Sequence, residues 1–133
     1  MKGNKLMKKV VFSEKGPAAI GPYSQGIRTD KTIFVSGQLG VIPETGAFPE
    51  GGIAEQTKQS LTNIKNILAS EGYEMKDVVK VTVLLKDIND FAAMNEVYGT
   101  FFEAGSYPAR SAFQVAALPK GGLVEIETIA YKD

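Results

Sequence analysis

The spacing of apolar residues predicts two helices with a strand between them. Between residues 53 and 70, apolar side chains recur every three or four positions, which places them on one face of a helix. Residues 79–85 alternate strictly instead, as in a strand that buries one face. A second helical stripe follows between residues 91 and 102, and either Asp87 or Asp90 can cap it. Amphipathic helices that alternate with strands are typical of a sheet that carries helices.

Further strands are predicted at both ends of the chain. Residues 10–12, 24–29 and 31–38 precede the first helix, and residues 110–118 and 123–131 follow the second. The order β-β-β-α-β-α-β-β predicts an α+β fold in which a single mixed β-sheet has both helices packed on one face. Several strands are apolar on both sides, so the other face of the sheet is expected to be an interaction surface used for self-association.

Length and composition limit the chemistry of the chain. Its 133 residues fit a single domain, of which residues 1–7 are expected to be a disordered or dispensable extension. The 15 basic and 15 acidic residues give a net charge of zero, which argues against a nucleic-acid binder. The sequence has no cysteine and no histidine, which excludes disulfides, Cys/His zinc sites and Ser-His-Asp triads, and no metal site is expected.

No segment of the sequence is expected to enter a membrane or to direct export. The basic start, MKGNKLMKKVVF, lacks the apolar run of a signal peptide. The longest uncharged stretch, residues 111–119, is much shorter than the ~20 residues that a spanning helix needs. The expected location is therefore cytoplasmic.

Arg110 is the strongest candidate for binding an anion. It begins a predicted strand that has no other charge as far as Leu118, and its planar guanidinium suits a two-pronged contact with a carboxylate. A salt bridge at the edge of the strand is the alternative interpretation. The second arginine, Arg28, lies beside a predicted turn and is interpreted as a solvated charge.

Two carboxylates lie in the last predicted strand. Glu125 and Glu127 are two positions apart, so their side chains face the same side. They could serve as a base, pair with Arg110, or simply face solvent. Glu125 is the better functional candidate because it lies nearer the preceding turn.

Three other features are chemically notable. Asn95 falls within the apolar stripe of the second helix, where an amide needs a hydrogen-bond partner. Tyr23 lies in a Gly-Pro-Tyr loop, where its hydroxyl could reach a ligand or its ring could pack in the core. Ser36 and Gly37 lie at the end of a strand, where a glycine allows the backbone to approach a ligand closely. Spacing alone indicates no particular reaction.

Separate sequence motifs follow one another in order between residues 10 and 131. They are Gly21-Pro22-Tyr23-Ser24-Gln25-Gly26, Ser36-Gly37-Gln38, Asp87-Ile88-Asn89-Asp90-Phe91 with Asn95 and Tyr98, Pro108-Ala109-Arg110-Ser111-Ala112-Phe113, Leu118-Pro119 and Val124-Glu125-Ile126-Glu127. Together they resemble the signature of the RidA (YjgF-type) family of reactive-intermediate deaminases.

The resemblance implies a fold, an assembly and an activity. The fold is chorismate-mutase-like and forms a homotrimer with ligand sites in clefts between subunits. The activity is hydrolysis of 2-imino acids or their enamines, such as 2-iminopropanoate and 2-iminobutanoate, to 2-oxo acids and ammonia without a cofactor. A non-enzymatic trimer that binds small carboxylates, as a chaperone or regulator, is the alternative. RNA cleavage, which the family name has also carried, is disfavoured by the zero net charge and the lack of histidine.

The resemblance also implies roles for individual residues. The carboxylate-binding arginine of the family falls on Arg110, and its water-activating glutamate falls on Glu125. The remaining substrate-binding positions fall on Tyr23, Ser36, Gly37, Phe91, Asn95 and Ala112. Many members have cysteine where this chain has Ala112, so a thiol-based side activity is excluded and only a backbone contact is expected there.

Overall fold

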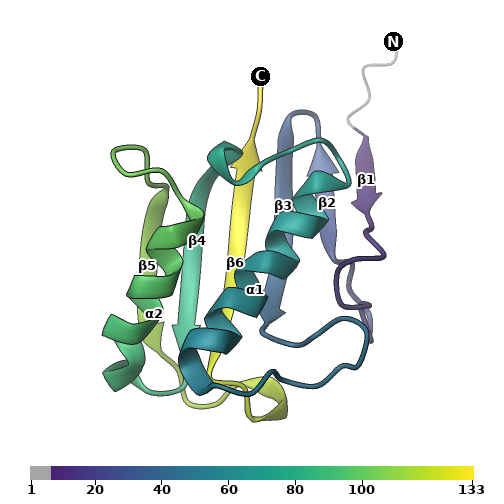
Figure 1. Ribbon diagram of the computed structural model, residues 1–133. Helices are drawn as coiled ribbons and strands as arrows, with labels where there is room; N and C mark the ends of the chain where they lie inside the picture. Colours follow the sequence, from purple (N-terminus) through teal and green to yellow (C-terminus); the bar gives the residue numbers. More distant parts are fainter. Residues whose placement is uncertain (1–6) are drawn as a thin grey trace.

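The computed structural model describes residues 7–133, which form one mixed sheet and two helices (Figure 1). The strands are β1 (Lys8–Val11), β2 (Gly26–Thr29), β3 (Thr32–Leu39), β4 (Val78–Leu85), β5 (Ala109–Gln114) and β6 (Val124–Tyr131). The helices are α1 (Gly52–Ala69) and α2 (Phe91–Tyr98). The predicted order of elements is confirmed. The expectation for the first six residues lies outside the described part of the chain.

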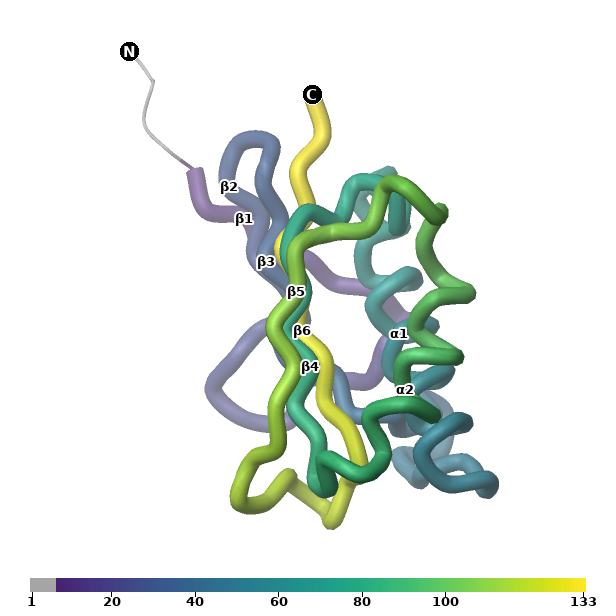
Figure 2. The backbone as a smooth tube through the Cα atoms, turned by 90° about the vertical axis from the view of Figure 1, so that its left-hand side faces the viewer, coloured from purple at the N-terminus to yellow at the C-terminus, as the bar shows by residue number. Residues whose placement is uncertain are grey.

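The sheet has the strand order β1-β2-β3-β6-β4-β5, and both helices cover the same face (Figure 2). All neighbouring strands run antiparallel except β4 and β5, which are parallel. The single mixed sheet with two helices on one face is therefore confirmed. Within residues 7–133, no helix is both long enough and apolar enough to cross a membrane.

Helix α1 forms because its apolar stripe meets the sheet. Leu61, Ile64, Ile67 and Leu68 are fully buried, and α1 packs against β3, β6 and α2. Gly72 follows the end of the helix with a φ of +76°, a left-handed conformation that favours glycine.

The second helix is shorter than its apolar stripe. Helix α2 ends at Tyr98, and a 3-10 turn, Gly99–Phe101, continues it. Asp87 caps the 3-10 turn Ile88–Asp90 that precedes α2, because its Oδ1 accepts a hydrogen bond of 2.9 Å from the backbone of Asn89, whereas the N-cap position of α2 itself is Asp90. Asp90 makes no such bond.

The predicted strand 110–118 is shorter in the structure. Its pairing with β4 reaches Leu85 opposite Gln114, and β5 ends there because its partner strand ends. Strands β5 and β6 are not a hairpin, since β4 lies between them in the sheet. The connection from β5 to β6 includes a short 3-10 turn, Pro119–Gly121.

A β-bulge interrupts the pairing of β3 with β6. Val35 lies opposite Thr128, and Gln38 lies opposite Ile126, so Ser36 and Gly37 together oppose a single residue. Such bulges bend a strand and redirect its side chains. This bulge faces the cavity described below.

The face of the sheet without helices carries an apolar row. Val10, Ile27, Phe34 and Ile129 lie directly opposite one another on four neighbouring strands. Val10 is 58% exposed and Phe34 is 45% exposed, which is unusual for large apolar side chains on adjacent strands. An uncovered apolar face was predicted from residues 79–85 and 110–118; the structure has such a face, but this row lies on other strands, β1, β2, β3 and β6.

Candidate active site

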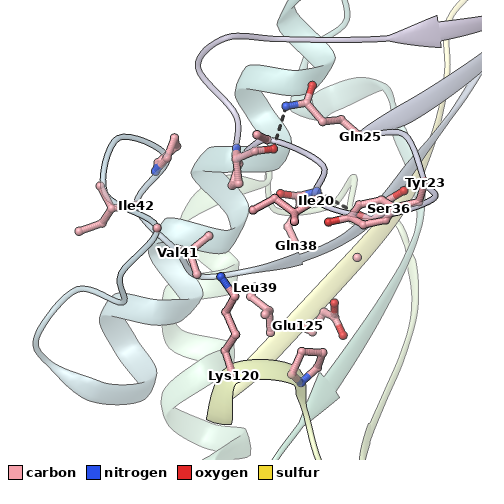
Figure 3. Close-up of a pocket in the computed structure, with 16 residues that line it drawn as sticks. Ile20, Tyr23, Gln25, Ser36, Gln38, Leu39, Val41, Ile42, Lys120 and Glu125 are labelled. Carbon is pink, nitrogen blue, oxygen red and sulfur yellow. Dashed lines mark hydrogen bonds between the residues drawn. The ribbon is translucent and has the colours of Figure 1, made fainter.

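A cavity of about 700 Å³ lies beside the bulge in β3 (Figure 3). Its walls come from the loop before β2, the bulged end of β3, the loop after β3, the turn before β6 and the first residues of β6. Four of the residues expected to bind substrate or act in catalysis line it: Tyr23, Ser36, Gly37 and Glu125. We call these four residues the glutamate cluster.

Glu125 is the acidic side chain of the cavity. It is partly buried, and within residues 7–133 it makes neither an ion pair nor a side-chain hydrogen bond. Burial, and to a lesser degree the negative charge of Glu127, raises the pKa of the Glu125 carboxyl above its ordinary value. A carboxyl with a raised pKa exchanges protons closer to neutral pH, as a general acid or base requires.

The bulge makes room for this carboxylate. A Cβ atom added to Gly37 would lie 2.8 Å from Oε2 of Glu125, closer than a Cβ atom normally approaches another atom, so the carboxylate would have to shift. The backbone of Gly37 is not in the left-handed region, so the requirement for glycine comes from space and not from conformation.

Ser36 supports the loop that carries Tyr23. Its Oγ donates a 2.6 Å hydrogen bond to the carbonyl of Ser24, and its backbone N–H donates to the carbonyl of Gln25 at 2.9 Å. Gln25 is buried and donates in turn to the carbonyls of Ser13 and Pro17. Tyr23 is 53% exposed beside the cavity, so the alternative of a buried core tyrosine is wrong.

Arg110 lies elsewhere, against α2. Its Nη1 donates a 2.6 Å hydrogen bond to Oδ1 of Asn95, and its Cζ lies 4.7 Å from the ring centroid of Tyr98 and 5.5 Å from that of Phe91. The three helical residues are spaced by four and three positions, so they share one face of α2. The amide of Asn95 therefore has the partner that its position demands.

The remaining predicted site residue, Ala112, lies on β5 two positions after Arg110 and packs against the core. Phe91, Asn95, Arg110 and Ala112 form what we call the arginine cluster. Among residues 7–133, no ion pair includes Arg110, so the alternative of an edge salt bridge is wrong.

The two clusters lie on opposite faces of the sheet. Arg110 is opposite Val81, which is buried under the helices, and its side chain contacts α2. Glu125 is opposite Leu84, whose side chain faces the other way because side chains alternate along β4. The possibility that Glu125 pairs with Arg110 within one chain is therefore wrong. A single chain does not present both residues to one small molecule.

Sequence analysis missed Lys120, the other charged side chain among the described residues that line the cavity. It lies in a turn between Pro119 and Gly121 and has a φ of +59°, a conformation that strains any residue except glycine. The sequence predicted a turn at this position, but periodicity does not show in which direction the side chain of a turn residue points. Within residues 7–133, no group of acidic side chains is arranged to hold a metal ion.

The interpretation of Arg28 as a solvated charge is wrong. Its Nη1 lies 3.1 Å from Oε1 of Glu71, its Nε donates to the carbonyl of Asp30, and its Cζ lies 5.3 Å from the ring centroid of Tyr73. Burial raises the pKa of Glu71, but hydrogen bonds from Lys9 and Arg28 outweigh it and hold the pKa below its ordinary value. Arg28 therefore has a structural role far from the cavity.

Comparisons with known proteins give consistent results. The family model described as Endoribonuclease L-PSP matches residues 13–132. The 2-iminobutanoate/2-iminopropanoate deaminase of Bos taurus is 57% identical over 125 residues, which cover 94% of this chain and 90% of that protein. The crystal structure of the YjgF gene product from E. coli is 46% identical, with a TM-score of 0.89, and the match covers 94% of this chain and 99% of that one. The crystal structure of E. coli TdcF with bound serine is 43% identical, with the same TM-score and the same coverage.

Proposed function

The chain belongs to the Endoribonuclease L-PSP family, together with the RidA and YjgF proteins, and we propose from this that it is a hydrolytic deaminase of 2-imino acids. Its substrates are 2-iminopropanoate and 2-iminobutanoate or the corresponding enamines, and its products are 2-oxo acids and ammonia. Relatives named for this activity, 50–57% identical over 94% of the chain, support the assignment. The observation that carries it is the Glu125 carboxyl, held with a raised pKa in a cavity beside a glycine bulge.

The site requires a second copy of the chain. Because Arg110 and Glu125 lie on opposite faces of the sheet, a substrate that contacts both must lie between two subunits. We propose a homotrimer with a chorismate-mutase-like arrangement, in which each subunit offers its arginine cluster to the glutamate cluster of the next. The exposed apolar row on the open face supports an assembly of this kind. Light scattering at micromolar concentration should give about three times the 14.3 kDa mass of one chain.

Catalysis begins with the carboxylate of the substrate. The guanidinium of Arg110 binds it through two parallel hydrogen bonds and so fixes the position of the imine carbon, C2. Glu125, from the neighbouring subunit, accepts a proton from a water molecule whose oxygen attacks C2, and the C=N bond becomes a single bond. The nitrogen takes up a proton from solvent and forms an amine on a tetrahedral carbon.

The second half of the reaction returns the proton. Protonated Glu125 donates this proton to the amine nitrogen, the C–N bond breaks, and ammonia leaves. The new hydroxyl group loses its proton to solvent and becomes the carbonyl of the 2-oxo acid. The Tyr23 hydroxyl and the backbone near Gly37 and Ala112 complete the polar lining. General acid–base catalysis contributes a factor of about 10²–10⁴, and no covalent intermediate is needed.

The alternative function is a trimer that binds small carboxylates without catalysis, as a regulator or chaperone. The arginine cluster serves both functions equally well. Glu125 separates them, because a protein that only binds carboxylates gains nothing from a second, partly buried anion near its ligand. RNA cleavage finds no support in the zero net charge and the lack of histidine. The cytoplasmic location stays a prediction.

The test is the rate of ammonia release from freshly generated 2-iminopropanoate, measured with and without the protein. The wild type should accelerate hydrolysis, and Arg110→Ala should abolish the acceleration. Arg110→Lys keeps the charge but loses the two-pronged geometry, so it should also reduce activity sharply while the fold persists. A wild-type protein that leaves the spontaneous rate unchanged would exclude the enzymatic function.

A further inference from the structure

The ring of Tyr98 lies against the guanidinium of Arg110. Tyr98 belongs to one of the sequence motifs, but no role was expected for it from the sequence. The Cζ atom of Arg110 is nearer to this ring, at 4.7 Å from the centroid, than to the ring of Phe91, at 5.5 Å. We propose that Tyr98 is a positioning residue, whose ring fixes the orientation in which Arg110 presents its N–H groups to the substrate carboxylate. The inference rests on the proposed function, in which Arg110 binds that carboxylate.

Tyr98 is itself held rigidly. Its side chain is 5% exposed, and its ring packs against that of Phe102 with centroids 4.8 Å apart and planes tilted by 40°. Phe102 in turn packs against the core. Because the ring is packed against Phe102 and buried, it limits the positions open to the guanidinium that lies against it.

The surroundings of Arg110 restrain it without neutralising it. Phe91, Asn95 and Tyr98 are all uncharged, and within residues 7–133 no carboxylate forms an ion pair with Arg110. An aromatic ring attracts a cation through its negative face but accepts none of the strong hydrogen bonds that a carboxylate would take. The side chain of Asn95 accepts a hydrogen bond from Nη1, and the other N–H groups of the guanidinium are available to bind an anion. A glutamate at position 98 would hold Arg110 as firmly, but it would compete with the substrate.

The hydroxyl group of Tyr98 does not help to orient Arg110. Its Oη is buried and has no hydrogen-bond partner among the described residues. A buried hydroxyl without a partner destabilises the folded state. The proposal therefore assigns the effect to the aromatic ring, which phenylalanine would preserve and an aliphatic residue would not.

Two substitutions separate the ring from the hydroxyl. Tyr98→Met fills the space with a flexible apolar side chain, and it is expected to raise the KM for 2-iminopropanoate by about 3- to 30-fold with kcat within about threefold of the wild type. Tyr98→Phe keeps the ring, so KM should stay within about twofold while the melting temperature rises. If Tyr98→Met does not fold, Tyr98→Leu takes its place in the comparison.

The matched control is Phe102→Leu. This substitution also removes an aromatic ring, but one that contacts Tyr98 and not Arg110. It should lower the melting temperature and raise KM much less than Tyr98→Met does, because the ring of Tyr98 beside Arg110 is still present. A rise in KM in Phe102→Leu equal to that in Tyr98→Met would overturn the proposal, because a general loss of packing would then explain both.

A second readout does not depend on catalysis. Calorimetric titration with 2-oxobutanoate, a stable 2-oxo acid, should show weaker binding to Tyr98→Met and wild-type binding to Tyr98→Phe. If the wild type binds 2-oxobutanoate but hydrolyses no imine, the proposed function fails while the role of Tyr98 is still tested. If all variants bind 2-oxobutanoate as tightly as the wild type does, the role of Tyr98 is refuted.

Discussion

Arg110 faces the helices and Glu125 faces the opposite side of the sheet, and strand β4 separates the two strands that carry them. Because of this arrangement, Arg110 and Glu125 of the same chain cannot form an ion pair. In the proposed assembly, each residue keeps its charge available until a second chain brings the opposite cluster to it. The proposed roles of Arg110 in carboxylate binding and of Glu125 as a base both depend on this separation.

A mixture of two inactive variants should regain activity. Arg110→Ala chains have an intact glutamate cluster, and Glu125→Gln chains have an intact arginine cluster. When the two are refolded together in equal amounts, about one quarter of the subunit interfaces should combine two intact clusters. Activity should recover to about a quarter of the wild-type value. Mixing without refolding is the control, and a refolded mixture as inactive as its components would show that each site belongs to one chain.

Gly37→Ala should reduce turnover and leave the fold intact. The new Cβ atom would lie 2.8 Å from Oε2 of Glu125, so the carboxylate must move away. Moving a catalytic carboxylate out of its working position typically lowers kcat by about 10- to 100-fold. Gly99→Ala is the control, because a Cβ atom there would meet nothing within 4 Å. Steady-state kinetics that are equal for the two variants would contradict the role of the bulge.

Glu125→Gln should separate catalysis from binding. The amide keeps the shape of the side chain but cannot accept a proton from water, so kcat should fall by about 10²–10⁴-fold. Affinity for 2-oxobutanoate should hold or increase, because one anion near the ligand carboxylate is gone. Glu127→Gln, which changes an exposed carboxylate on the same strand face, should have little effect at neutral pH. A Glu125→Gln protein with wild-type turnover would leave the cavity a binding site only.

The pH dependence of the rate should report the raised pKa of Glu125. Catalysis needs the ionised carboxylate, so kcat/KM should fall as the pH drops through a pKa above the ordinary 4.5. Replacing Glu127 by Gln removes a repulsive charge and should move this acid limb to lower pH. An acid limb at the same pH in both proteins would show that the charge of Glu127 does not reach Glu125.

The same shift makes a prediction about stability. A carboxyl whose pKa is higher in the folded than in the unfolded state stabilises the fold when protonated, and this contribution is lost as the pH rises through the folded pKa. Glu125→Gln should therefore melt at a higher temperature than the wild type at pH 7, and the difference should shrink as the pH falls. A lower melting temperature at pH 7 would indicate that the ionised carboxylate has a stabilising partner.

Sequence patterns predicted the elements better than their arrangement. Periodicity identified α1 and β4, because a buried helix face and a buried strand face have different repeats. It did not predict that β6 lies between β3 and β4, and it is this strand order that puts Arg110 and Glu125 on separate strands with β4 between them. The early end of β5 was missed for a similar reason, since it depends on where the partner strand ends.

Motifs in the sequence suggested candidate site residues, but not that the structure divides them into two groups on opposite faces of the sheet. Motif resemblance pointed to all the residues of both clusters, because motifs preserve chemistry in sequence order. The contacts of Arg110 with α2 and of Arg28 with Glu71 join residues 15 and 43 positions apart, and such pairings depend on the tertiary fold. The ring of Tyr98 was missed because an aromatic residue in an apolar stripe is usually core, and Tyr98 is indeed buried there.

The cavity beside the bulge has a volume in the range of pockets that hold drug-sized molecules, whereas a three- or four-carbon imino acid is far smaller. Its wall includes the apolar side chains of Leu39, Val41 and Ile42. An enzyme that recognises its substrate through the carboxylate and the C=N bond, as proposed above, responds to a functional group and not to an individual metabolite. Such a protein is suited to be a general scavenger, which clears a whole chemical class of unstable by-products whatever amino acid gave rise to them.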